Sequence, residues 1–113
     1  MHEYSIVEAL LARVDAEARA RGATAVHRLS VRIGELSGVE VDLLTAAYAT
    51  FRERTICEHA ELAVEAVPAE WGCPECGSVI ARGVPLRCPR CGVPAKLTGG
   101  DEILLDRIEM EVP

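Results

Sequence analysis

The sequence predicts an α+β protein with a metal-binding module inserted between two of its strands. Two stretches place apolar residues at helical spacing, and three others alternate apolar and polar residues as strands do. Residues 68–100 follow neither pattern, and they hold two Cys-x-x-Cys pairs and five of the six prolines. We therefore expect an α/β domain made of residues 1–67 and 101–113, with a separate module at residues 68–100.

The first element is expected to be a helix from about Tyr4 to Arg21. Charged residues such as Arg13 and Glu17 fall between its apolar positions, so one side is predicted to be buried and the other exposed. Gly22 stands where a residue with positive φ commonly ends a helix. The apolar positions are Ile6, Val7, Leu10, Leu11, Val14 and Ala18.

A strand over residues 25–33 and a second helix are predicted next. The segment GELSGVE breaks the strand alternation, and Ser37 with Glu40 three positions later has the spacing of a capping box. The helix is expected to continue to about Arg54. The residues predicted to share one face are Leu29, Val31 and Ile33 in the strand, and Leu44, Ala47, Tyr48 and Phe51 in the helix.

Two further strands are expected on either side of the module, over residues 61–67 and 103–112. Each alternates apolar and polar residues, which predicts one buried face per strand. The apolar residues expected to lie together are Leu62, Val64 and Ala66 in the first of these strands, and Leu104, Ile108 and Met110 in the second.

Composition excludes several classes of partner. The formal net charge is −6, whereas nucleic-acid binding depends on lysine and arginine residues that neutralise phosphates. No apolar run reaches the length of roughly 18 residues that a membrane span requires. The N-terminus lacks the basic and apolar regions of a signal peptide. We expect a cytoplasmic protein with neither nucleic acid nor membrane as a partner.

The two cysteine pairs predict a metal site. They lie in the near-identical segments CPECG, residues 73–77, and CPRCG, residues 88–92, and eleven residues separate Cys76 from Cys88. Two sulfurs at this spacing reach one ion, and the glycine after the second cysteine tolerates positive φ. Four thiolates suit zinc in a closed, structural site, because a segment this short and polar cannot form its own core. The predicted zinc ligands are Cys73, Cys76, Cys88 and Cys91.

Two other chemistries use similar cysteine pairs. A rubredoxin-like iron site has such knuckles, but it is accompanied by an aromatic-rich core, and Trp71 is the only aromatic residue of the module. A redox dithiol needs one pair on a thioredoxin-like unit rather than two matched pairs. The fifth cysteine, Cys57, is interpreted as a small buried hydrophobic residue.

The first three residues, Met1, His2 and Glu3, offer a second set of metal ligands. The N-terminal amine and the His2 amide close a five-membered chelate ring, the His2 imidazole adds a six-membered ring, and the Glu3 amide supplies a fourth nitrogen. Four nitrogens in one plane suit Ni(II) or Cu(II). By spacing alone, a single histidine near a terminus is more often a solvated residue than a metal ligand. His27 is interpreted as a strand residue at the edge of the core face, and His59 as an exposed residue.

Taken together, several stretches resemble the HypA/HybF proteins, which insert nickel during [NiFe]-hydrogenase maturation. They are the opening MHEYSIVEAL, the IGELSGV turn, FRERTICEHAELAVE, the two cysteine knuckles and the closing GGDEILLDRIEMEV, and they span essentially the whole chain. The resemblance implies two helices on one face of a three-stranded sheet, with a zinc module extending from two strands. It also implies nickel as transferred cargo at Met1, His2 and Glu3, and structural zinc at the four paired cysteines.

The resemblance further implies two protein partners, a nucleotide-hydrolysing nickel-insertion protein and the precursor of the hydrogenase large subunit. The chain is not expected to be an enzyme, since it has neither a glycine-rich phosphate loop nor a Ser-His-Asp or Cys-His arrangement. Two alternatives remain at this stage. One is a zinc-ribbon module that binds protein or nucleic acid, and the other is a rubredoxin-like electron carrier.

Overall fold

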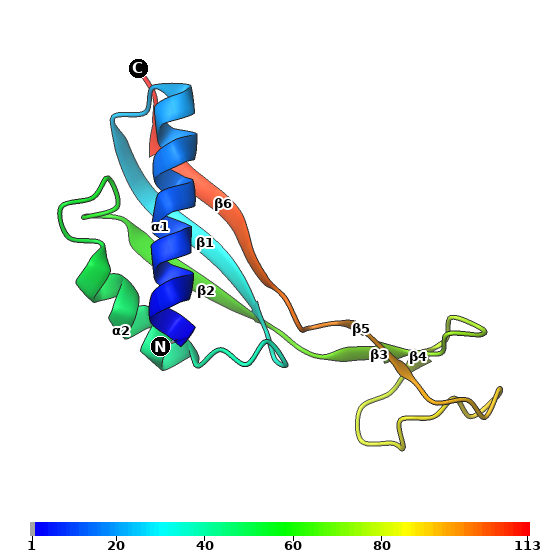
Figure 1. Ribbon diagram of the computed structural model, residues 1–113. Coiled ribbons are helices and arrows are strands. Elements are labelled where there is room, and N and C mark those ends of the chain that lie inside the picture. The colour runs from blue at the N-terminus through cyan, green and yellow to red at the C-terminus, as the bar shows by residue number, and fades with distance from the viewer. Residues whose placement is uncertain (1) are drawn as a thin grey trace.

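A computed structural model describes residues 2–113, and for His2 it describes the backbone alone. Two helices and six strands follow one another along the chain (Figure 1). Their bounds are α1 His2–Arg21, β1 Ala25–Gly34, α2 Val41–Phe51, β2 Glu61–Val67, β3 Glu70–Gly72, β4 Val79–Ile80, β5 Lys96–Gly99 and β6 Ile103–Glu111. The predicted order of helices and strands, with an insert before the last long strand, is confirmed.

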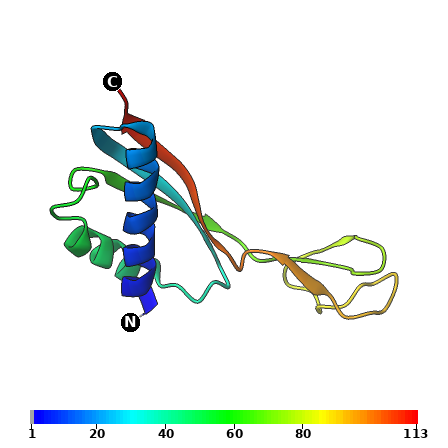
Figure 2. The same cartoon turned by 45° about the horizontal axis from the view of Figure 1, so that its top comes forward.

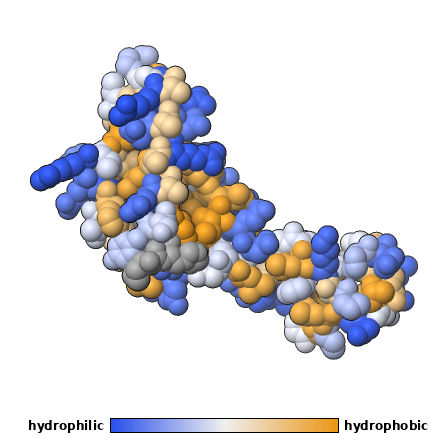
Figure 3. Space-filling model, viewed as in Figure 1, coloured by the Kyte–Doolittle hydropathy of each residue, from blue (hydrophilic) through white to orange (hydrophobic). Residues whose placement is uncertain are grey.

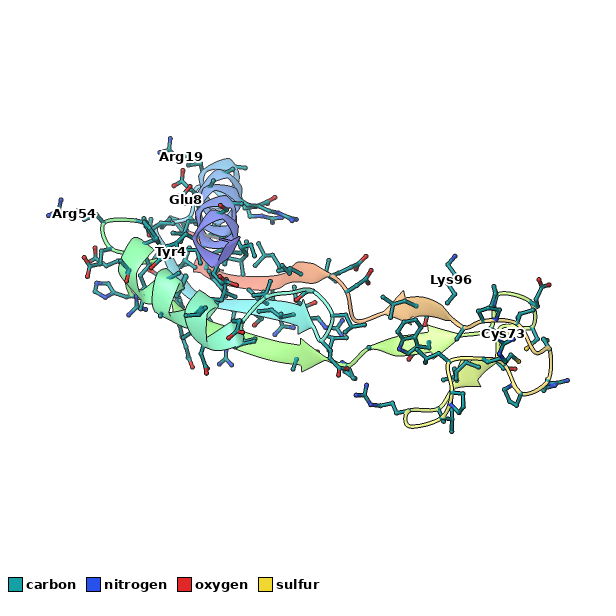
Figure 4. All side chains as sticks on the ribbon, turned by 60° about the horizontal axis from the view of Figure 1, so that its bottom comes forward. Tyr4, Glu8, Arg19, Arg54, Cys73 and Lys96 are labelled. Carbon is teal, nitrogen blue, oxygen red and sulfur yellow. The ribbon has the colours of Figure 1, made fainter. Side chains whose placement is uncertain are left out.

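The main sheet has the strand order β2-β1-β6. Strand β1 pairs in parallel with β2, so that Leu29 lies opposite Leu62, and it pairs antiparallel with β6, so that Leu29 also lies opposite Ile108. Both helices lie on one face of this sheet (Figures 1 and 4). The edge of the Tyr4 ring in α1 meets the Phe51 ring in α2 with the centroids 5.2 Å apart. The expected fold class is therefore confirmed.

An aliphatic core fills the space between the helices and the sheet. It is built from the positions that helical and strand periodicity select, because those side chains point away from water on each element. Its buried members include Val7, Val14 and Ala18 of α1, Leu29, Val31 and Ile33 of β1, and Leu44, Ala47 and Tyr48 of α2. The opposite face of the sheet is polar, with ion pairs such as Arg32–Glu65 at 2.9 Å joining neighbouring strands.

The capping-box prediction at Ser37 is wrong. Helix α2 is capped by Glu40, whose side chain makes no capping bond, and the Ser37 hydroxyl instead accepts a hydrogen bond from the Val39 amide at 3.3 Å. Gly38 has φ of 80°, which takes the chain out of a helical path between these residues. The helix also ends at Phe51 rather than near Arg54, whose φ of 63° is left-handed.

The predicted face of strand β6 is also partly wrong. Ile108 and Met110 pack against the core as expected, but Leu104 is 46% exposed, and the partly buried Ile103 and Leu105 pack against the core instead. The register shifts between the pairs Ser30–Arg107 and Val31–Leu105. The extra residue of this bulge reverses which side chains face the core, because side chains alternate along a strand.

The inserted module extends from the end of the main sheet as a thin arm (Figures 1 and 2). Its own sheet has the order β4-β3-β5, with antiparallel pairing throughout. The molecule consequently measures 55 × 29 × 17 Å along its principal axes. Neither helix of the described residues has the length and apolar character that a bilayer crossing requires.

Candidate metal centre

The two cysteine knuckles fold in the same way. In the first, the amides of Glu75 and Cys76 donate to the Cys73 sulfur at 3.3 and 3.4 Å, and the Gly77 amide donates to the Cys73 carbonyl at 2.9 Å. Gly77 has φ of 76°, which a residue without Cβ adopts without strain. Amides that point at a sulfur favour its ionised form, the form that binds a metal.

The second knuckle repeats this geometry. The Cys91 amide donates to the Cys88 sulfur at 3.4 Å, and the Gly92 amide, on a residue with φ of 72°, donates to the Cys88 carbonyl at 2.9 Å. The near-identity of CPECG and CPRCG is therefore a repeat of backbone structure as well as of sequence.

The four sulfurs of Cys73, Cys76, Cys88 and Cys91 all lie within 4.8 Å of one another. The Sγ atoms of Cys76 and Cys88 are 3.7 Å apart. Ligands about 2.3 Å from a tetrahedral zinc ion stand about 3.8 Å from each other. The spacing of this cluster therefore fits one tetrahedral metal ion, and four thiolates form a donor set for zinc or iron.

The electrostatics of the cluster also favour a cation. Hydrogen bonds from Ser78 lower the pKa of Cys76 to about 6, whereas contact with the Cys76 sulfur and loss of hydration raise the pKa of Cys91 to about 12. Four thiolates this close together would also repel one another. A divalent cation among them removes the repulsion, since a coordinating thiol is deprotonated outright.

Little other than these sulfurs holds the module together. Its hydrophobic cluster has only Cys73, Ile80 and Cys88 as buried members, with Trp71, Val93 and Ala95 packed against them. Figure 4 places Cys73 at the far end of the arm, away from the main core. A cluster of this size is too small to fold a segment without a metal ion or a disulfide.

The second predicted site lies at the start of α1, where Met1 and the His2 side chain fall outside the described residues. Glu3 is described, and the residue is only 7% exposed. Its carboxylate accepts a hydrogen bond from the Glu40 amide at 3.4 Å, next to the first residue of α2. The fold thus brings Glu40 beside Glu3, a neighbour that no sequence signal indicated.

The remaining candidates lie elsewhere. The His27 side chain is 61% exposed on β1 and lies 3.4 Å from a Glu111 carboxylate oxygen. The His59 side chain is 91% exposed, as predicted. Cys57 is fully buried in the main core, and this burial raises the pKa of its thiol, which confirms its interpretation as a hydrophobic residue. Within the described residues, neither histidine joins a metal cluster.

Comparison with known proteins gives one consistent result. Residues 1–110 match the family model described as hydrogenase/urease nickel incorporation, metallochaperone, hypA. The hydrogenase maturation factors HypA of Aquifex aeolicus and Wolinella succinogenes are each 39% identical, over 99% and 98% of this chain and 99% and 96% of their own length.

Solved structures agree in fold. The solution structure of the Ni metallochaperone HypA from Helicobacter pylori is 30% identical with a TM-score of 0.74, and it is matched over 98% of both chains. A second solution structure of a HypA protein is 32% identical with a TM-score of 0.83, over all of this chain and 98% of its own. The chain belongs to the HypA family of nickel-incorporation metallochaperones.

Proposed function

We propose that this protein carries Ni(II) to the assembly of a [NiFe]-hydrogenase active site and binds it at Met1, His2 and Glu3. The observation that carries the proposal is the burial of Glu3 beside Glu40. It anchors the first turn of α1 against the start of α2 in a family member whose chain opens with Met-His-Glu. The ion is cargo, so its ligands must hold it and also give it up.

The nitrogens of this segment are suited to that task. The first amides of a helix have no acceptor within the helix, so a metal that replaces their protons breaks no helical hydrogen bond. In this proposal the Glu3 carboxylate stays with α2 and Glu3 offers the ion its backbone nitrogen. The N-terminal amine, the His2 amide and the His2 imidazole complete a planar donor set that Ni(II) favours. Because protons must leave, nickel binding weakens as the pH falls.

The four-cysteine cluster has a different role in the proposal. Cys73, Cys76, Cys88 and Cys91 hold Zn(II), which fills all four positions and leaves none for a substrate. Zinc therefore folds residues 68–100 as a module, and residues 1–67 with 101–113 form the nickel-binding domain. The protein performs no catalysis of its own.

Delivery requires partners. We propose a nucleotide-hydrolysing insertion protein and the precursor of the hydrogenase large subunit, both met in the cytoplasm. A planar site at a chain terminus leaves both faces of the ion open to an incoming ligand, whereas a buried cage has to open first. That difference suits transfer from protein to protein.

The test changes one covalent bond. Untagged protein and a version with Gly-Ser placed before Met1 are titrated with Ni(II) at neutral pH, and the absorption of the planar nickel complex is recorded. We expect the band in the untagged protein alone, because the extension converts the amine ligand into an amide.

His2→Gln, which keeps the amine but removes the imidazole, is the matched variant and should also lose tight binding. Zinc content and helix content should stay the same in all three proteins. Equal nickel binding by the extended and untagged proteins would exclude the N-terminal chelate and direct attention to His27 and His59.

A further inference from the structure

The turn that follows β1, at residues 35 and 36, contacts both chain segments that connect the arm to the main sheet. The Glu35 amide donates to the Val67 carbonyl at 2.8 Å, at the end of β2. The Leu36 amide donates to the Gly100 carbonyl at 2.7 Å, just before β6. One short turn is thus hydrogen-bonded to the outgoing and the returning segment at the same time.

The Glu35 side chain extends this contact into the arm itself. Its carboxylate accepts hydrogen bonds from the Ala69 amide at 2.8 Å and from both terminal nitrogens of Arg82, at 2.9 and 3.0 Å. Arg82 also donates to the Ala69 carbonyl at 3.4 Å. The paired bonds match the planar fork of a guanidinium to the two oxygens of a carboxylate, a geometry that fixes direction as well as distance.

The backbone around this ion pair is closely packed. A Cβ atom at Gly34 would lie 2.3 Å from the Gly100 carbonyl carbon, and one at Gly100 would lie 2.5 Å from the Ala69 Cα. Trp71, Leu36 and Leu86 line a shallow cavity of about 240 Å³ beside Arg82. The joint is therefore narrow, and Glu35 and Arg82 form its only ion pair between the described parts of the arm and the body.

We propose that Glu35 and Arg82 act as a latch that fixes the orientation of the four-cysteine arm relative to the main sheet. Two connecting strands alone form a hinge, because they restrain the position of the arm much more than its direction. The bidentate pair supplies a third point of attachment away from the two strands. This inference is independent of the proposed nickel site, since neither residue is one of the proposed nickel ligands.

The chemistry of the pair supports a latch that stays closed. The hydrogen bonds from Arg82, followed by the bond from the Ala69 amide, lower the pKa of Glu35 to about 2. The Arg82 and Glu35 side chains are 65% and 41% exposed, so the pair adds little to the free energy of unfolding of the whole protein. Its removal should consequently change the orientation of the arm and leave the fold and the metal content intact.

The test measures orientation in the zinc-loaded full chain. Residual dipolar couplings of backbone amides are recorded for the arm and for the body, and one alignment tensor is fitted to both. The wild type should fit a single tensor. For Arg82→Gln and for Glu35→Gln, a single tensor should no longer fit the couplings of both parts. The couplings in the arm should also become smaller, because the arm then moves independently of the body. Glu35→Gln retains an oxygen that can accept from Ala69, so it isolates the ion pair.

Two controls make the result decisive. Lys96→Gln removes the same charge from the arm at a side chain that points into solvent (Figure 4), and it should behave as the wild type does. The double variant Glu35→Gln/Arg82→Gln should equal the single variants, because the two residues act through one contact. A wild type that needs two tensors, single variants that keep one, or single effects that add would each overturn the latch.

Discussion

The hydroxyl group of Tyr48 donates a hydrogen bond to the carbonyl oxygen of Ala60 at 2.9 Å inside the main core. Arg52 donates to the same oxygen at 3.0 Å, and its guanidinium lies 5.7 Å from the centre of the Tyr48 ring. Burial raises the pKa of Tyr48 to about 12, because ionisation would place a charge in the core. This contact fastens the loop between α2 and β2 to the second helix.

Tyr48→Phe should lower the free energy of unfolding by only about 1 kcal/mol, the typical value of one hydrogen bond whose acceptor keeps another partner. Arg52 remains bonded to the Ala60 oxygen and prevents the larger penalty of an unsatisfied buried carbonyl. Urea denaturation followed by circular dichroism measures the change. Tyr4→Phe, at a partly exposed ring, serves as the control. A loss several times larger would mean that Arg52 does not hold this oxygen in the variant.

Cys88→Ala should release the zinc and unfold residues 68–100 while the aliphatic core of the main domain survives. The metal replaces a hydrophobic core only within the module. Elemental analysis gives the zinc content, and amide spectra show which residues lose their structure. Cys57→Ala removes a cysteine outside the cluster and should keep one equivalent of zinc. Full zinc retention by Cys88→Ala would contradict the four-thiolate site.

The thiol of Cys57 should be the least reactive of the five. It is fully buried, and burial raises its pKa, so almost none of it is thiolate at neutral pH. After zinc is removed with a chelator, a thiol reagent should modify four cysteines quickly and Cys57 only upon global unfolding. Mass spectrometry of the labelled peptides identifies the sites. Rapid labelling of Cys57 in the folded protein would show that the main core opens locally.

Charge reversal at Arg13 should weaken hydrogenase maturation without changing nickel affinity. Arg13 lines an open groove of about 460 Å³ between α1 and β6, and apolar atoms gather beside α1 on this side of the molecule (Figure 3). Under the proposed function, a protein that receives nickel from Met1, His2 and Glu3 would have to approach this helix. Glu8 does not line that groove and projects away from β6 (Figure 4), so Glu8→Lys is the matched control.

Hydrogenase activity in cells carrying each variant, together with nickel titration of the purified proteins, measures the two effects separately. Full activity with Arg13→Glu would remove this side of α1 from consideration as the docking surface. An equal loss with Glu8→Lys would indicate a general effect of charge on the helix.

Local pattern was sufficient to predict most of the secondary structure and the four-cysteine cluster. The periodicity of a helix or strand reflects which of its side chains are apolar and avoid water. That property can be read from the local sequence of α1, β1 and β2 without knowledge of their neighbours. The spacing of the two Cys-x-x-Cys pairs predicts that their four sulfurs lie close together, because thiolates at that spacing converge on one ion. The Met-His-Glu assignment rests on covalent spacing and stays a proposal.

Only the tertiary structure decided features that depend on distant parts of the chain. The bulge in β6 turns Leu105 instead of Leu104 toward the core. The register of β6 depends on its pairing with β1, and the sequence of β6 alone does not contain that information. The Glu3–Glu40 and Glu35–Arg82 contacts join residues 37 and 47 positions apart. No local pattern predicts them, because their partners become neighbours only when the helices and the arm have taken their places.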